Sequence, residues 1–183
     1  VNLTAFETYF SERRPFFVEG KNIYQFQPSN SIVIHNMQAD NLFYSRRIGR
    51  SPHNYPDLSD NEYADVPEAT TILGALKLSG KTKNGLSIGI LESVTANENA
   101  TIDNNGERRK ESVEPLTNYF VGRVQKDFNK GETVLGGMLN AVNRNITNPA
   151  LNYLPQEAYT GGIDFSHNWN DRTWYVSGNT EFS

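Results

Sequence analysis

Six extended segments of nearly equal length constrain the fold of this chain most strongly. They lie at about 71–82, 86–96, 116–128, 132–144, 159–169 and 172–182, and they are rich in Gly, Thr, Val and aromatic residues. Each has about 11 residues, longer than a typical globular strand of about 5–6 residues and similar to the roughly 9–11 tilted residues with which a β-strand crosses a bilayer. This pattern predicts long antiparallel strands, and their length favours a membrane β-barrel over a sandwich.

The connections between these segments alternate between short and long. Asn84-Gly85, Asn129-Lys130-Gly131 and Asn170-Asp171 each join a pair of segments, and Asn and Gly tolerate the positive φ that tight hairpin turns demand. Residues 97–115 and 145–158 are long polar connections, which we interpret as loops. In an up-and-down meander, all short turns lie at one rim and all long loops at the other, as in outer-membrane barrels.

Polar and apolar residues alternate most clearly in the last two segments. Period-two alternation places neighbouring side chains on opposite faces of a strand. One face is predicted to meet lipid through Ile163, Phe165, Trp169, Trp174 and Val176. The other is predicted to line a lumen, with Asp164, Ser166, Asn168 and Glu181, together with Arg123 and Gln125 from the segment at 116–128. The two Trp residues flank the last turn, either as an aromatic girdle or as a simple cross-strand pair.

The first hairpin shows a similar alternation, which predicts one apolar face formed by Ile72, Leu76, Leu78, Leu86, Ile88 and Ile90. The residues before it are irregular, with short strands suggested at 31–36 and 40–48 and a short helix around 4–11. We therefore expect an irregular segment, 1–70, packed in or against the barrel, followed by a β-meander of about six long strands, 71–183.

Six strands cannot close the smallest membrane barrel, which needs about eight. We expect the chain to be a fragment of a larger barrel, because it begins without Met or a leader and stops inside a strand. Flanking sequence, or the irregular segment, would then cover the open edges of the sheet.

Composition excludes several classes of protein. No apolar run approaches the roughly 20 residues of a membrane-spanning helix, so a helical membrane protein is excluded. A net charge of −4 and a pI near 5.4 argue against nucleic acid as a partner. The absence of cysteine rules out disulfides and thiolate metal sites.

Several short phrases carry a family resemblance. They are Asn2-Leu3-Thr4-Ala5-Phe6-Glu7, Glu12-Arg13-Arg14-Pro15-Phe16-Phe17-Val18-Glu19-Gly20, Leu42-Phe43-Tyr44-Ser45-Arg46-Arg47-Ile48-Gly49-Arg50, Ala64-Asp65-Val66-Pro67, Thr71-Ile72-Leu73-Gly74-Ala75 and Glu114-Pro115-Leu116-Thr117-Asn118-Tyr119. Because these phrases occur in this order and spacing, the chain resembles a Gram-negative outer-membrane β-barrel family of unknown function. Members usually carry this region C-terminal to a carbohydrate-binding module of the family-nine type. The resemblance implies a location at the outer membrane and a link to glycans, but it supplies no catalytic residues.

Clustered arginines are the most suggestive polar residues, namely Arg13, Arg14, Arg46, Arg47 and Arg50. Guanidinium groups in a lumen could bind ligand carboxylates or line an anion-selective constriction. Alternatively, they pair with internal carboxylates and hold the irregular segment in place. Acidic residues between 57 and 68 fit no calcium-loop template, and the three histidines lack the spacing of a metal pair. We therefore predict no metal, no cofactor and no catalytic residues.

These observations lead to two hypotheses. The first is an all-β, antiparallel outer-membrane barrel domain, acting as a scaffold or passage for glycan binding, uptake or surface display, with outer-membrane lipid and glycans as partners. The second is a soluble all-β carbohydrate-binding or glycoside-hydrolase-associated domain. In the soluble case, the apolar face would be buried beneath another sheet.

Overall fold

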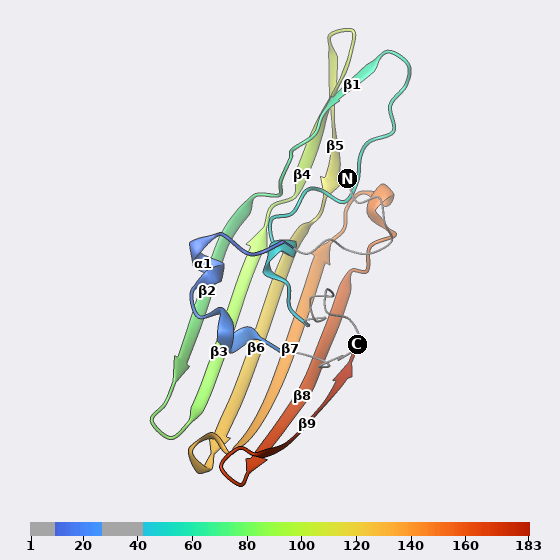
Figure 1. Cartoon of the computed structure of the whole chain (residues 1–183). Helices are drawn as coiled ribbons and strands as arrows, with labels where there is room; N and C mark the ends of the chain where they lie inside the picture. Colours follow the sequence, from blue (N-terminus) through green and yellow to red (C-terminus); the bar gives the residue numbers. More distant parts are fainter. Residues whose placement is uncertain (1–9, 27–41) are drawn as a thin grey trace.

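Six long strands form one antiparallel, up-and-down sheet in the computed structural model, which describes residues 10–26 and 42–183 (Figure 1). The strand order is β2-β3-β6-β7-β8-β9. Their bounds are β2 Ile72–Lys81, β3 Leu86–Thr95, β6 Leu116–Phe128, β7 Thr133–Asn145, β8 Glu157–Trp169 and β9 Trp174–Phe182. The predicted all-β antiparallel meander is confirmed. The sheet is open, with β2 and β9 at its edges.

A second, smaller sheet projects beyond one end of the first (Figure 1). It contains β1 (Glu62–Asp65), β4 (Glu98–Asn104) and β5 (Glu107–Glu114), in the order β1-β4-β5. The prediction of a loop over residues 97–115 is therefore wrong. Asn105 and Gly106 both have positive φ, 52° and 99°, as a type I′ hairpin turn requires, and this turn joins β4 to β5.

The short turns gather at the opposite end of the large sheet, as predicted (Figure 1). All three residues of the turn from Asn129 to Gly131, the 3-10 turn η3, have positive φ, as do Asn170, Asp171 and Arg172. At Asn84-Gly85 only the glycine does, with φ 79°. Its N–H donates to the Thr82 carbonyl at 3.0 Å. This turn is therefore not type I′, because that type requires positive φ at both central residues.

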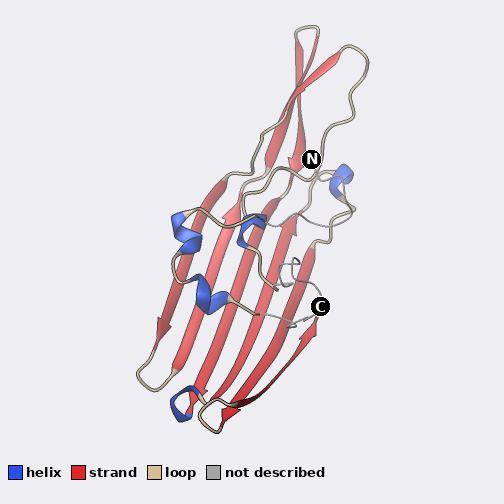
Figure 2. Cartoon of the chain, in the orientation of Figure 1, coloured by secondary structure: helices blue, strands red, loops and turns tan. Residues whose placement is uncertain are grey.

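Residues 10–26 and 42–53 lie across one face of the large sheet (Figure 2). We call this the inner face, the opposite one the outer face, and residues 42–53 the inner strap. The covering chain contains α1 (Pro15–Val18) and the 3-10 turns η1 (Lys21–Tyr24) and η2 (Ser45–Arg47); a further 3-10 turn, η4 (Pro149–Leu151), lies between β7 and β8. The core lies between the two layers and includes Phe17, Tyr24, Phe26, Ile48, Leu91, Tyr119, Val121 and Met138.

Two expectations for the irregular segment can be compared with the structure. A strand at 40–48 is wrong where it is described, because η2 makes a tight turn there. The suggested strand at 31–36 and most of the suggested helix at 4–11 lie outside the described residues; residues 10 and 11 are not helical.

Glycines on the inner face allow the covering chain to approach the sheet closely. A Cβ on Gly89 would lie 2.8 Å from Ile23 Cγ2, and one on Gly162 would lie 2.5 Å from Phe26 Cζ. The Tyr24 hydroxyl donates at 2.9 Å to the carbonyl of Ile90, the residue that follows Gly89 on β3. Because Gly89 and Gly162 have no side chain, they leave room on the sheet for side chains of the covering chain.

Strand register assigns every side chain to a face. The bulge between Ile72 and Gly74 shifts the pairing by one residue, so Ile72 sits opposite Thr95 and packs against the inner core. Its predicted place on the apolar face is wrong, because one inserted residue reverses the face of the residues before it. The other five apolar residues of this hairpin, Leu76, Leu78, Leu86, Ile88 and Ile90, are on the outer face.

Among residues 10–26 and 42–183, no helix combines the length and apolar character needed to cross a membrane.

Candidate functional site

A buried ion pair crosses the middle of the inner face. Arg123 on β6 is 2% exposed, and its Nη2 donates to Asp164 Oδ2 on β8 at 2.9 Å, with a second bond from Nη1 to Oδ1. The pair passes over Gly136 on β7, where a Cβ would lie 2.6 Å from Asp164 Oδ1. The Arg123 guanidinium also lies over the Phe26 ring, 5.4 Å from its centroid. The ion pair therefore links β6 to β8 across β7, and the contact of Arg123 with Phe26 joins it to the covering chain.

The register places the remaining predicted lumen residues on the same face. Gln125 donates to Asp127 Oδ1 at 3.2 Å. Glu181, on edge strand β9, is exposed and accepts from Asn179 at 3.3 Å. Ser166 and Asn168 also lie on this face. Gln125 Oε1 also accepts from Arg123 Nη2 at 3.5 Å. Apart from Arg123, Asp164 and Gln125, this polar set does not converge on one point.

Arg14 links residues 10–26 of the covering chain to the inner strap. It forms a two-pronged contact with Glu12, with Nη2 to Oε2 at 2.6 Å and Nε to Oε1 at 3.0 Å. It also donates to the carbonyls of Ile48 at 2.7 Å and Ser45 at 2.9 Å, and it lies 4.2 Å from the Phe17 ring centroid. Burial would raise the pKa of Glu12, but hydrogen bonds from Arg14 and Ser45 and the Arg14 charge lower it from 4.5 to about 2.

Two other predicted arginines also contact their own covering chain. Arg13 is exposed and its backbone N–H donates to Glu12 at 2.9 Å. Arg46 donates to the Ser11 carbonyl at 3.2 Å and lies 5.8 Å from the Phe10 ring centroid. These side-chain contacts favour the structural interpretation for Arg14 and Arg46, whereas the contact of Arg13 involves only its backbone N–H and favours neither interpretation.

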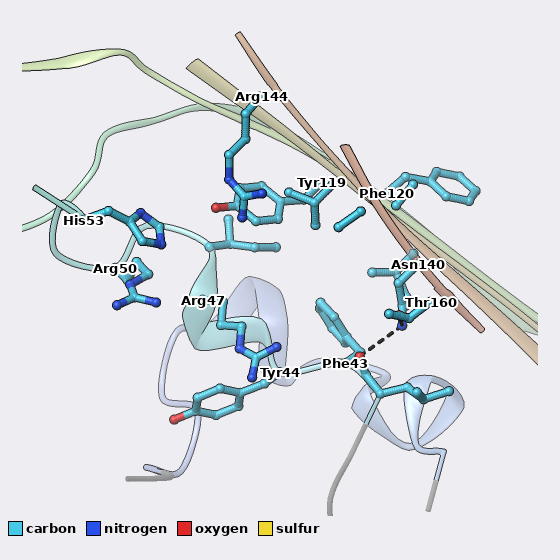
Figure 3. A pocket seen from close by; sticks show the side chains of 16 residues that line it. Phe43, Tyr44, Arg47, Arg50, His53, Tyr119, Phe120, Asn140, Arg144 and Thr160 are labelled. Atoms are coloured by element: carbon cyan, nitrogen blue, oxygen red, sulfur yellow. Dashed lines mark hydrogen bonds between the residues drawn. The ribbon is translucent and has the colours of Figure 1, made fainter. Parts of the chain in front are cut away.

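Arg47 and Arg50 instead line a cavity of about 360 Å³ between the inner strap and strands β6 to β8 (Figure 3). Arg144 from β7 lines the same cavity from the sheet side, and His53 lies beside Arg50 (Figure 3). No Asp or Glu is among the described residues that line it. The cavity therefore gathers positive charge contributed by two parts of the chain that are distant in sequence.

Aromatic and amide groups complete the wall. Phe43 and Tyr44 come from the strap, and Tyr119 comes from the sheet. Asn140 Nδ2 donates to the Leu42 carbonyl at 3.0 Å and to Thr160 Oγ1 at 3.1 Å. These bonds tie the end of the strap to β7 and β8.

A buried carboxylate orients His53 from behind. Glu114, at the end of β5, is 1% exposed, and its Oε2 lies 2.6 Å from His53 Nδ1 and accepts from the His53 backbone N–H at 2.8 Å. The Tyr153 hydroxyl donates to the His53 carbonyl at 2.8 Å. The strap is thus fixed at both ends, by Asn140 and by Glu114.

Sequence reasoning did not single out Arg144, Asn140 or His53 as members of one site. Period-two alternation does place Asn140 and Arg144 on one face of β7, and that signal was available. Their approach to the strap depends on how residues 42–53 cross the sheet, which alternation does not encode. Within the described part of the chain, no group of three His, Asp or Glu side chains could hold a metal ion.

Comparison with known proteins places the whole chain in one family. No curated protein and no solved structure matches it. A family model described as "Domain of unknown function (DUF5916)" matches residues 1–183. The chain therefore belongs to the DUF5916 family.

Proposed function

We propose that this chain forms part of the wall of an outer-membrane β-barrel, a scaffold or passage whose outer face meets lipid. One observation carries the proposal: the outer face is apolar and uncovered, whereas the inner face combines a buried apolar core with buried charges and is covered by residues 10–26 and 42–53. Among the described residues, Ile163 is 54% exposed and Val176 48%. Neighbouring strands add further exposed apolar side chains at Leu76, Leu78, Val124, Leu135 and Leu139.

An uncovered apolar surface of this kind is unfavourable in water. Monomeric soluble proteins rarely expose a contiguous apolar patch of more than a few hundred Å². Here the apolar positions extend across all six strands, from Leu78 on β2 to Phe182 on β9. Lipid tails would satisfy this surface without a second protein layer. A soluble sandwich would need another sheet over it, and no described residue supplies one.

The height of the apolar band fits a bilayer. On β8, the outer-face aromatics Tyr159 and Trp169 are ten residues apart, or about 33 Å along the strand at about 3.3 Å per residue. With the strand tilt of about 40° found in membrane barrels, that becomes about 25 Å, the height of the apolar band in such barrels. Trp169 pairs directly with Trp174 at the turn end, so the cross-strand pair is present and a girdle role for it is part of the proposal.

Polar residues reappear on the outer face near the long connections. Asn118 donates to Glu92 there, and Asn143 lies next to Asn118 on the neighbouring strand. This layer would mark the second membrane interface, with the β1-β4-β5 sheet projecting beyond it. The glycan connection implied by the family resemblance would then involve the inner face and the projecting sheet.

Fractionation of cells that express the full-length protein tests the proposal. We expect the protein in the outer-membrane fraction, resistant to extraction by high salt and migrating faster in gels when unheated than when boiled. Recovery in the soluble fraction, or release by salt alone, would contradict it.

A further inference from the structure

We propose that a cavity between two neighbouring turns binds the phosphoethanolamine headgroup of a membrane phospholipid. The cavity is lined by residues of the turn η3 and of the turn at residues 170–172, and we call it the turn cavity. The inference rests on the proposed function, since it assigns a headgroup to the lipid that the outer face would meet.

Strand pairing brings the two turns side by side, next to the outer face. Thr133 at the start of β7 pairs with His167 near the end of β8, and the Asn168 N–H donates to the Glu132 carbonyl at 2.7 Å. Trp169 lines the turn cavity and is 45% exposed on the outer face. Aromatic residues of membrane barrels mark the level of the lipid headgroups. A headgroup of lipid on the outer face would therefore lie beside this cavity.

Four charged side chains line the turn cavity, two of each sign. Lys130 and Arg172 are the cations, and Glu132 and Asp171 are the anions. Within residues 10–26 and 42–183, none of these four side chains forms an ion pair or a hydrogen bond. All four residues are exposed, so a ligand in the cavity can reach their charged groups.

This balance of charge matches a zwitterionic ligand better than a simple anion. The guanidinium of Arg172 and the ammonium of Lys130 are groups that bind phosphate oxygens. The carboxylates of Glu132 and Asp171 would repel an anion, but they can accept hydrogen bonds from the three N–H donors of a primary ammonium. Phosphoethanolamine carries one phosphate and one primary ammonium, so it would satisfy both signs of charge.

The backbone holds both cations in a conformation that glycine adopts more easily. Lys130 has φ 57° and Arg172 has φ 64°, and residues other than glycine, asparagine and aspartate are uncommon in this left-handed region. The turns themselves therefore do not call for long cationic side chains at these positions. Backbone strain of this kind gathers at functional sites, which agrees with a binding role for the two cations.

The size of the turn cavity suits a headgroup and not a whole lipid. Its volume is about 280 Å³, slightly below the range of roughly 300–1,000 Å³ for sites that enclose a complete small molecule. The acyl chains would extend from the cavity past Trp169 along the apolar outer face. One lipid would thus contact both the turn cavity and the outer face.

Native mass spectrometry of the full-length protein in detergent micelles tests the inference. Three phospholipids with identical acyl chains compete at equal concentration, with ethanolamine, choline or glycerol headgroups. Because the chains are the same, the outer face contributes equally to the binding of all three. We expect the ethanolamine lipid to be retained about fivefold more than either of the others, the factor that corresponds to about 1 kcal/mol from exposed charge pairs. Glycerophosphoethanolamine, which has no acyl chains, should bind more weakly than the lipid.

Two variants identify the groups that bind each part of the headgroup. Asp171→Asn removes a charge that would face the ammonium, and asparagine tolerates the left-handed φ of 51° at this position. We expect it to reduce the preference for the ethanolamine lipid over the glycerol lipid. Arg172→Gln should weaken retention of the ethanolamine lipid about fivefold. Lys83→Gln is the control for Arg172→Gln, because Lys83 lies in the neighbouring turn between β2 and β3 and does not line the cavity.

Equal retention of the three lipids would overturn the inference. Tighter binding of the glycerol lipid would also overturn it, because the cations alone would then account for binding. Equal losses in Arg172→Gln and Lys83→Gln would indicate general charge attraction, and glycerophosphoethanolamine that bound as tightly as the lipid would exclude a lipid site. Heat-modifiable migration of the same sample separates the two proposals: if it is present without a headgroup preference, only this inference fails, and if it is absent, both fail.

Discussion

The two faces of the large sheet are built from alternate residues of the same strands, yet they have opposite chemistry. On β8, Asp164 faces inward and pairs with a buried arginine, while its neighbours Ile163 and Phe165 face outward and stay 54% and 40% exposed. The inner face has the covering chain as its partner. The outer face has none among the described residues, and the lipid contact proposed above would account for this difference.

Glycine illustrates the same contrast between the faces. On the inner face, Gly162 makes room for a ring of the covering chain, Phe26. On the outer face, Gly161 is covered by a ring from the neighbouring strand, Phe182, whose Cζ would lie 2.5 Å from an added Cβ. Inner glycines thus serve docking of the covering chain, whereas this outer one is filled from within the sheet.

The largest expected effect comes from breaking the inner ion pair. Asp164→Asn leaves the Arg123 charge buried without its partner, and we expect a loss of about 3–5 kcal/mol in the free energy of unfolding. Urea titration of the detergent-solubilised protein measures it. The double variant Arg123→Met with Asp164→Leu should recover most of the loss. A neutral Asp164→Asn would contradict the structural role of the pair.

A charge on the outer face should cost nearly as much, and the cost should depend on depth. Ile163→Lys lies midway between the aromatic ends of β8 and should destabilise the folded protein in lipid vesicles by about 2–4 kcal/mol. Val176→Lys lies beside the Trp pair and should cost about 0–1 kcal/mol. Ser166→Lys, on the inner face of β8, the strand that carries Ile163, is the control. Equal effects at all three positions would remove the distinction between the faces.

Filling an inner glycine should have a smaller effect. Gly162→Ala places a methyl group against Phe26 and the Thr180 carbonyl, and overpacking of this kind costs about 1–3 kcal/mol. Gly178→Ala on the outer face meets no atom within 4 Å and should be close to neutral. Thermal unfolding of both variants checks the difference, and a neutral Gly162→Ala would show that the covering chain is not seated there.

The smallest effect should be the pH-dependent one at Glu12. Because the folded-state pKa is lowered to about 2, the carboxylate stabilises the fold above about pH 4.5, and this contribution is lost as the pH falls towards 2. Glu12→Gln should cost about 1 kcal/mol at pH 7, since Arg14 is partly exposed and solvent screens the pair. The difference from the unaltered protein should vanish near pH 2. Urea midpoints at both pH values measure it, and a pH-independent difference would refute the mechanism.

Much of the sheet follows from local patterns, because strand length and alternation are properties of each segment alone. Two predictions were wrong where a local feature departs from the alternating pattern. Ile72 lies on the inner face because one residue bulges. Strand β5 was not predicted because it contains the charged run from Glu107 to Glu111. The turn at Asn105-Gly106 was the available signal for that hairpin.

The candidate site was less accessible to sequence reasoning. Arg47 and Arg50 could be named because they cluster in the chain, but clustering did not separate them from Arg14, whose partner Glu12 is only two residues away. Arg144 joins them across about a hundred residues. Such convergence depends on how the strap crosses the sheet, and local patterns carry no information on that.

The contact between the outer face and lipid can be tested most directly by single-cysteine spin labels along β8, since the chain contains no native cysteine. In lipid vesicles, labels at 163 and 165 should be accessible to dissolved oxygen and protected from a water-soluble nickel reagent. Labels at 164 and 166 should lack that lipid signature. If positions 163 and 165 were instead protected from both reagents, another protein layer would cover them and the membrane account would be contradicted.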